Sequence, residues 1–163
     1  EQTMEVRKAV TGIAVDSNVA KITVRGVVDR PGVAAGLLKP LADEGVSVDV
    51  IVQNTSSDGT TDFTFTVGQA SVVKAAQLIE DQSVIEYAEV ITGSNLAKVS
   101  IVGTGMENAP GYAARMFSTL SEAKVNIDMI TTSEIRITTI IDREQVQKAV
   151  QSLHDAFELE KSQ

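Results

Sequence analysis

The sequence lacks several features on which common functions depend. It contains no cysteine and one histidine, and its 14 basic and 22 acidic residues give a formal net charge of -8. Without cysteine there is no disulfide framework, so the reducing cytoplasm is the default compartment. No apolar run approaches the roughly 20 residues that span a bilayer, and no basic start precedes an apolar segment as in a secretory signal. The acidic balance, with no basic patch, leads us to expect neither nucleic acid nor membrane as a partner.

Residues suited to catalysis or to metal and nucleotide binding are equally scarce. His154 falls within a predicted helix and has no cysteine to join it as a metal ligand, so we expect a residue of the helix surface rather than a general base. Residues 102–105 (VGTG) resemble the start of a dinucleotide-binding loop, but Asn108 stands where the third glycine belongs. Since Gly103 has a counterpart in Gly26, close backbone packing explains this glycine better. We expect no catalytic residue, metal site or cofactor in this chain.

A pattern of strand, helix and strand in residues 20–54 returns, imperfectly, in residues 97–132. In the first copy an alternating apolar and polar strand leads into the sequence DRPG at residues 29–32. Its aspartate is a short acid at a helix boundary, and its proline is tolerated in the first helical turn. Apolar residues then recur at helical spacing across Pro40, where we expect a bend, until Gly45 ends the helix. The repetition indicates two small domains of one kind.

Each half of the sequence follows the order of a ferredoxin-like unit. In the first half, strands are expected at residues 46–53, 61–67 and 87–91, with a helix capped by Ser71. In the second half, Asp142 and Gln145 form a predicted capping box for the last helix. The fold class is therefore α+β, with two tandem βαββαβ units, each an antiparallel four-stranded sheet with two helices on one face.

The N-terminal strand belongs to neither unit in an obvious way. Residues 10–16 (VTGIAVD) are rich in β-branched residues but have no local partner, while the second half ends before a fourth strand. We therefore expect this strand to complete the second sheet, so that the first unit is inserted within the second. The predicted domains are residues 17–93, and residues 94–163 together with the strand at residues 8–16.

Binding is the chemistry that remains, and the start of the first long helix offers it. A helix N-terminus presents unpaired N–H groups that suit a carboxylate. These are the amides of Val33, Ala34 and Ala35. Asp29 beside them suits an ammonium group, so a zwitterion satisfies both, and Gln53 and Asn54 add amides able to read a ligand side chain. The alternative is that Asp29 only caps the helix and Gln53 faces water.

The motifs around these positions carry a resemblance to a known family. The repeated strand-DRPG-helix with VSVDVIVQN after it, then DGTTDFTF, and in the second half NIDMITTSEIRI, together resemble the tandem ACT domains of aspartate kinase (aspartokinase). These domains form the regulatory part, or beta subunit, which senses end products of the lysine pathway. The resemblance covers nearly the whole chain. It implies allosteric feedback inhibition of L-aspartate phosphorylation by threonine, with lysine as a further candidate effector. ATP and magnesium belong, on this interpretation, to the catalytic domain or subunit.

The resemblance assigns residues only where the motifs match. The positions that surround a threonine effector are Asp29, Gly32, Ala34, Gln53, Asn54 and Ser56 in the first unit, and Asn126 and Ile127 in the second, whose main chain closes the site. Positions with a regulatory or neighbouring role are Thr64, Thr132 and Ser133. The sequence departs from the family at Ala113 and at residues 107–108, so a separate pocket in the second unit stays an open question. The implied assembly is a homodimer through ACT edge strands, with the effector between two copies.

Two other classes share part of this pattern. Acylphosphatases have the same βαββαβ order, but they need an arginine in a phosphate cradle after the first strand, and Arg30 stands directly before Pro31 and Gly32 instead. The second alternative is an amino-acid-sensing ACT module of another metabolic enzyme or of a transcription regulator. The sequence contains no helix-turn-helix pattern, so a DNA-binding domain would have to be supplied from outside it.

Overall fold

The computed structural model describes residues 10–104, 106 and 111–158 of the 163-residue chain. The chain divides into two compact units: a first unit, Asn18–Leu96, and a second unit that combines Glu1–Ser17 with Ala97–Gln163. The N-terminal strand completes the second unit, as predicted from its lack of a local partner. Among the described residues, no helix is long and apolar enough to cross a membrane.

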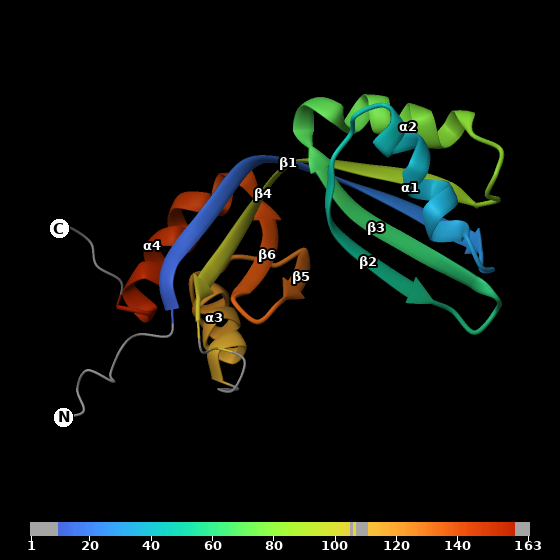
Figure 1. Cartoon of the computed structure of the whole chain (residues 1–163). Coiled ribbons are helices and arrows are strands. Elements are labelled where there is room, and N and C mark those ends of the chain that lie inside the picture. Colours follow the sequence, from blue (N-terminus) through green and yellow to red (C-terminus); the bar gives the residue numbers. More distant parts are fainter. Residues whose placement is uncertain (1–9, 105, 107–110, 159–163) are drawn as a thin grey trace. The chain divides into compact units, whose positions relative to one another are not determined.

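The strands and helices follow the predicted order (Figure 1). The strands are β1 (Val10–Val28), β2 (Val48–Thr55), β3 (Thr60–Gly68), β4 (Glu89–Gly103), β5 (Met129–Thr132) and β6 (Arg136–Asp142). The helices are α1 (Val33–Asp43), α2 (Val72–Asp81), α3 (Gly111–Glu122) and α4 (Val146–Ala156), with the 3₁₀ helices Gln69–Ser71 and Arg143–Gln145 directly before α2 and α4. The strand order is β2-β3-β1-β4 in the first unit and β1-β4-β6-β5 in the second. This is the α+β, ferredoxin-like pair that was expected.

The long strands β1 and β4 depart from the sequence prediction, which divided each of them into two. β1 has 19 residues and β4 has 15. Residues 18–28 of β1 and 89–96 of β4 serve the first unit, and their remaining portions serve the second. Neither strand contains a proline, so every residue along each strand keeps the backbone N–H that pairing with a neighbouring strand requires. Each unit therefore has four strands, and β1 and β4 each contribute one portion to both units.

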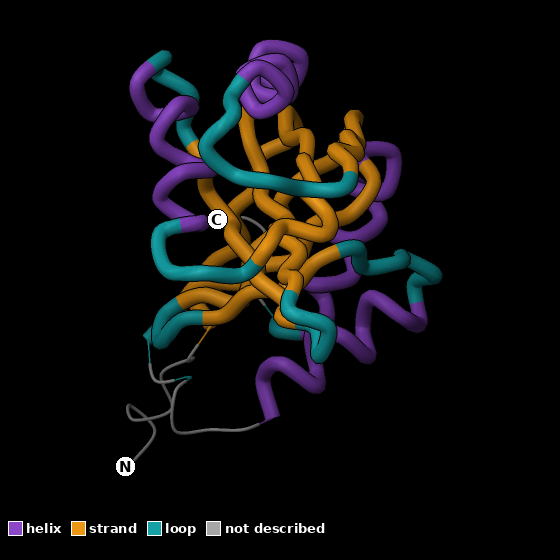
Figure 2. The backbone as a smooth tube through the Cα atoms, turned by 90° about the vertical axis from the view of Figure 1, so that its right-hand side faces the viewer, coloured by secondary structure: helices purple, strands orange, loops and turns teal. Residues whose placement is uncertain are grey.

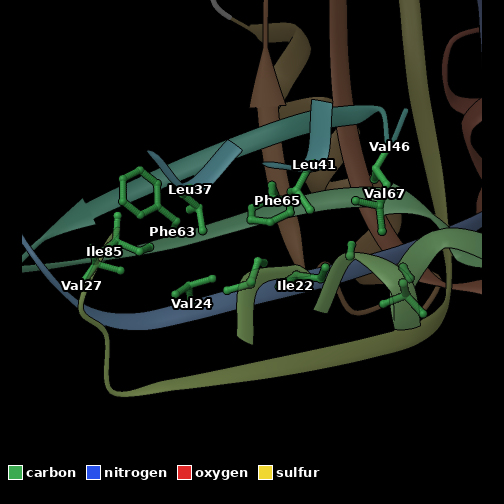
Figure 3. Packing of buried hydrophobic residues seen from close by; sticks show 14 of the residues in the cluster. Ile22, Val24, Val27, Leu37, Leu41, Val46, Phe63, Phe65, Val67 and Ile85 are labelled. Atoms are coloured by element: carbon green, nitrogen blue, oxygen red, sulfur yellow. The ribbon is translucent and has the colours of Figure 1, made fainter. Parts of the chain in front are cut away.

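The core of the first unit lies between its strands and the helices α1 and α2. Alternation along β3 brings Phe63 and Phe65 to one face, where they pack with Ile22 of β1 and with Leu37 and Leu41 of α1 (Figure 3). All five side chains are almost completely buried. α1 continues past Pro40 to Asp43, so the proline does not shorten it.

The core of the second unit combines side chains from both ends of the sequence. Met116 and Leu120 of α3 and Leu153 of α4 pack in one cluster with Val10 and Ile13 of β1. Figure 2 shows the backbone of the chain coloured by secondary structure. The N-terminal strand thus contributes apolar surface to this core as well as backbone pairing, which explains why it belongs to the second unit.

The starts of the helices differ from the predicted caps. Gly32 is the N-cap of α1, and no side chain, that of Asp29 included, makes a cap hydrogen bond there. Ser71 occupies the N-cap of α2 but also makes no such bond. The predicted capping box of Asp142 and Gln145 is wrong, because a 3₁₀ turn intervenes and moves the start of α4 beyond Gln145.

Candidate functional site

A hollow of about 460 Å³ opens at the start of α1, in the size range of small-ligand sites. It is formed by the loop between β1 and α1, by the first turn of α1 and by one residue of β2. The lining residues are Asp29, Arg30, Pro31, Gly32, Val33, Ala34 and Gln53. Most of the positions proposed from the sequence of the first unit therefore lie around a single hollow.

The first turn of α1 presents hydrogen-bond donors to this hollow. Gly32 has φ 94°, a left-handed conformation that costs glycine little, and open space lies where a side chain would be. Val33 N donates to Arg30 O at 3.2 Å, whereas the amides of Ala34 and Ala35 have no main-chain acceptor among the described residues. Because no side chain caps the helix either, this end can hold an anion such as a carboxylate.

Asp29 supplies the opposite charge. Its side chain is exposed, and its main-chain N–H donates to Gly59 O at 3.0 Å, which extends the pairing of β1 with β3 by one residue. The residue is therefore fixed by its backbone while its carboxylate stays available to a ligand. Donors on one wall and a carboxylate on another match the two charged groups of a zwitterion.

Gln53 has an amide whose orientation is fixed by a buried neighbour. Its Nε2 donates to Thr61 Oγ1 at 3.2 Å, and Thr61 Oγ1 in turn donates to Asn54 O at 3.0 Å. A hydroxyl has a single proton, so Thr61 can only accept from Gln53, and this network assigns the amide orientation. Thr61 is fully buried. The Oε1 atom of Gln53 is left as an acceptor for a ligand group that donates, such as a hydroxyl or an ammonium.

Three other predicted residues of the first unit lie close in the chain but not among the lining residues. Ala35 follows Ala34 in α1, and Asn54 contributes its carbonyl to Thr61. Ser56 lies in the turn after β2, where its N–H donates to Thr60 O at 2.8 Å. None of these three residues lines the hollow.

Thr64 lies on β3, away from the hollow. Its hydroxyl is 3.1 Å from that of Thr23 on β1. Because Phe63 and Phe65 on either side of it face the helices, Thr64 points to the opposite face of the strand. Thr64 does not line the hollow, so no contact there explains the regulatory role that the family resemblance implies for it.

In the second unit, Asn126 and Ile127 line a different cavity of about 630 Å³. The other lining residues are Phe117, Ser121, Lys124, Val125, Asp142 and Gln145. Thr132 ends β5 opposite Ile137, and Ser133 N donates to Arg136 O at 2.8 Å; neither Thr132 nor Ser133 lines this cavity. The predicted site residues thus fall into two groups, one in each unit.

The described residues that were considered for catalysis or metal binding form no such site. His154 is half-buried rather than at the helix surface, and its Nδ1 is enclosed with no hydrogen-bond partner among the described residues. The part of the chain that the structure describes holds no cluster of three or more histidine, cysteine or acidic residues suited to a metal. Glu107, Asn108 and Gly105 lie outside the described residues.

The turn before β3 is ordered by hydrogen bonds to the carboxylate of Asp58. Thr60 donates to Asp58 Oδ1 through its hydroxyl at 2.7 Å and through its N–H at 3.0 Å. The hydroxyl bond first, and the backbone bond second, lower the pKa of Asp58. This turn places Gly59 O where Asp29 N–H reaches it.

Sequence reasoning missed Thr61 and Asp62 as parts of the site. Thr61 orients Gln53, and Asp62 Oδ1 accepts from Gly26 N at 2.8 Å. Both belong to the DGTTD sequence that was used only as a family signature. Their roles depend on strand register, which no local pattern reveals.

The comparisons with known proteins agree with this fold. The ACT domain family matches residues 21–83 and, in a second variant, residues 99–157. The aspartokinase of Pseudomonas aeruginosa is 45% identical over 161 residues, which are 98% of this chain and 39% of that protein. The aspartokinase of Corynebacterium glutamicum is 40% identical over 152 residues, 91% of this chain and 36% of that protein. The chain thus spans less than half the length of these curated relatives.

Solved structures of separate regulatory chains match over their whole length. The ligand-free regulatory subunit of aspartate kinase from Thermus thermophilus has a TM-score of 0.84 and 38% identity, covering 92% of this chain and 99% of that one. A chain in a structure of aspartokinase alpha and beta subunits has a TM-score of 0.85 and 45% identity, covering 93% of this chain and 100% of that one. With two ACT domains and this degree of likeness, the chain belongs to the ACT-domain family as a regulatory chain of the aspartate kinase type.

Proposed function

We propose that the hollow at the start of α1 binds threonine and that this binding regulates an aspartate kinase catalytic domain or subunit. The observation that carries the proposal is the combination of Asp29, the uncapped amide of Ala34 and the oriented amide of Gln53 around one hollow. A free amino acid has a carboxylate for the helix amides and an ammonium for Asp29. The hydroxyl of threonine then donates to Gln53 Oε1.

Lysine is the second candidate effector. It shares the α-carboxylate and α-ammonium of threonine, and its side-chain ammonium is also a donor for Gln53 Oε1. We place threonine first because the first-unit motifs match the threonine positions of the family. A joint effect of the two amino acids belongs to the same proposal, with lysine acting at this hollow or elsewhere in the enzyme.

The proposed assembly is a homodimer in which a second copy completes the site. β2 and β5 are the edge strands of the sheet, so each leaves backbone groups unpaired along one side. Ile51 on β2 and Ile130 on β5 are large apolar residues with 48% and 44% of their surface exposed. Pairing of such edge strands between two copies would satisfy the unpaired backbone groups and bury the exposed apolar side chains. In this assembly the main chain at Asn126 and Ile127 of the second copy closes the hollow.

Regulation follows from unequal affinity for two states. If threonine binds one arrangement of the dimer more tightly than another, it shifts the population toward that arrangement. Inhibition results when the catalytic part, which binds ATP, magnesium and L-aspartate, is less active in the threonine-bound arrangement. The chain itself contributes the effector site and the dimer contact.

The test is calorimetric titration with threonine, lysine and both, together with sedimentation to follow the dimer. Asp29→Ala and Gln53→Ala should each weaken threonine binding by about 10- to 100-fold, the effect of losing one charge-assisted or polar ligand contact. Threonine should no longer stabilise the dimer of these variants. The matched control is Asp43→Ala, which removes an exposed carboxylate at the other end of α1 and should bind like the wild type. Unchanged affinity in both site variants would rule out this site.

A further inference from the structure

β1 carries a β-bulge shortly before it reaches the hollow. The pairing of β1 with β3 shifts register between Val24 and Val27. Two residues of β1, Arg25 and Gly26, therefore lie opposite the single residue Asp62 of β3. Gly26 has φ 67°, the left-handed conformation that the bulged position of such a motif requires.

The bulge is held from both sides by specific contacts. Gly26 N, which the interrupted ladder leaves without a strand partner, donates to Asp62 Oδ1 at 2.8 Å. On the other side Ala88 N donates to Arg25 O at 2.8 Å. A Cβ atom at Gly26 would lie 2.9 Å from the Cβ of Ala88, so there is no room for a side chain. A carboxylate bond to a backbone N–H is among the stronger hydrogen bonds, which makes Asp62 the main lock.

The bulge determines which way the end of β1 faces. Val24 and Val27 are both fully buried in the core of the first unit, and Figure 3 shows both on the side of β1 where Phe63 lies. In a regular strand, residues three apart point to opposite faces. The extra residue restores Val27 to the core side, and Asp29, two residues further, follows it to the side on which α1 begins. Without the bulge, Asp29 would point to the opposite face of the sheet.

We infer that Asp62 is a positioning residue of the effector site: by locking the bulge at Gly26 it aims the Asp29 carboxylate at the ammonium group of the bound amino acid. This inference rests on the proposed function, because it assigns a role within the same site. Asp62 does not line the hollow, so it acts on the ligand through residues that it positions, and its bond to Gly26 N leads along β1 to Asp29.

The experiment compares two ligands that differ only in the group that Asp29 recognises. Threonine and (R)-3-hydroxybutyrate share the carboxylate and the hydroxyl, but the second lacks the ammonium group. Affinities are measured on the full chain, by calorimetry for threonine and by ligand-observed NMR for 3-hydroxybutyrate. In Asp62→Ala, threonine affinity should fall about tenfold or more, the effect of one lost charged contact, while 3-hydroxybutyrate affinity stays as in the wild type.

Two variants serve as controls for this loss. Asp62→Asn keeps an oxygen acceptor for Gly26 N and should restore most of the preference for threonine over 3-hydroxybutyrate. Glu89→Ala removes the carboxylate that pairs with Arg25 at 3.2 Å beside the bulge without touching the lock, and should leave both affinities unchanged. If Asp62→Ala does not fold, Gly26→Ala disturbs the same bulge from the other strand through strain at φ 67° and contact with Ala88, and is judged by the same ratio.

The outcomes separate this inference from the proposed function. Equal loss of affinity for both ligands would mean that Asp62 supports the unit as a whole, and would overturn the inference. Threonine binding that depends on Asp29 but not on Asp62 would overturn the inference alone. A wild-type chain that binds neither ligand would overturn the proposed function and the inference together.

Discussion

In the first unit β1 turns toward the helix side at the bulge of Gly26, whereas the corresponding glycine of the second unit, Gly103, has no positive φ and its N–H donates to Ile135 O at 2.9 Å. Counting back from the 3₁₀ helix that follows β3 and β6, Arg136 takes the place of Asp62. The second unit therefore has no carboxylate at the position of the lock. The two units share a fold, but among the described residues the left-handed glycine whose N–H donates to a carboxylate occurs in the first unit.

The two units also differ at the positions of Gln53, which lines the hollow, and of Thr61, which orients it. By the same count Ile135, with 51% of its surface exposed, stands where the first unit has the buried Thr61. Thr132 stands in the repeat where the first unit has Gln53. The second unit thus lacks both the oriented amide and the hydroxyl that orients it. The core position of Phe63 keeps an apolar residue in its counterpart Ile137, whereas the positions around the hollow differ between the two units.

The largest loss of stability is expected when the portion of β1 that belongs to the second unit is deleted. Deletion of residues 1–16 removes Val10 and Ile13 from the second core and the bond from Thr11 Oγ1 to Val102 O at 3.2 Å. Burial of Val10 alone contributes about 1.5–3 kcal/mol, so the total loss is several kcal/mol. Hydrogen exchange should show loss of protection in the second unit while the first stays protected. Deletion of residues 1–9, which leaves β1 intact, is the control. An intact second unit after the longer deletion would contradict the assignment of this strand.

A core substitution then tests whether the first unit depends on its aromatic residues. Phe65→Ala should destabilise that unit by about 3–5 kcal/mol, because it leaves a cavity in a fully buried position. Its counterpart Thr139 is equally buried but donates its hydroxyl to Val99 O at 3.0 Å. Thr139→Ala should cost only about 1–2 kcal/mol, mostly for the carbonyl left without its donor. Urea unfolding monitored by NMR gives the loss of unfolding free energy in each variant. Equal losses would contradict the expectation that the first unit depends more strongly on Phe65 than the second does on Thr139.

The sequence predicted those parts of the fold that follow from local periodicity. The alternating residues of β3, the apolar stripe of α1 and the unpartnered strand at residue 10 were enough for the element order and the topology. Fusion of two predicted strands into β1 was not foreseen, because the polar residues at positions 16–18 interrupt the β-branched pattern, although no proline there prevents backbone pairing. The cap at Asp142 failed because a single 3₁₀ turn displaces the helix start.

The site was predictable only in part, for a related reason. Asp29, Gly32 and Gln53 stand next to recognisable signals, a helix start and a strand end, so their positions could be deduced. Thr61 and Asp62 act across strands, and their contacts with Gln53 and Gly26 depend on the register shift in β1. A register shift has no local sequence signature beyond a glycine, so these two roles required the structure.

A smaller change tests the hydrogen bonds of Thr61, which the second unit lacks. Thr61→Val keeps the size of the side chain but removes the hydroxyl between Gln53 Nε2 and Asn54 O. Gln53 can then rotate, and threonine affinity should fall by about 3- to 10-fold, the loss of one neutral hydrogen bond. Thr61→Ser retains the hydroxyl and should bind close to the wild type. The comparison is made by calorimetric titration, and equal binding by both variants would show that the orientation of Gln53 does not depend on Thr61.

The smallest effect concerns the turn between β2 and β3, which Asp58 stabilises in the first unit. Hydrogen bonds from the hydroxyl and the N–H of Thr60 lower the pKa of Asp58, so its ionised form stabilises the folded turn. This stabilisation is complete above the pKa of the unfolded chain, near 4, and is lost as the pH falls through the lower pKa of the folded state. Asp58→Ala should therefore lower the thermal midpoint of the first unit slightly at pH 7, and the two proteins should converge toward pH 3. Asp58→Asn, which keeps an oxygen acceptor without the charge, should show the weaker acid dependence while retaining part of the stability. A constant difference between wild type and Asp58→Ala over this pH range would mean that the charge of Asp58 does not contribute to the turn on which Asp29 is anchored.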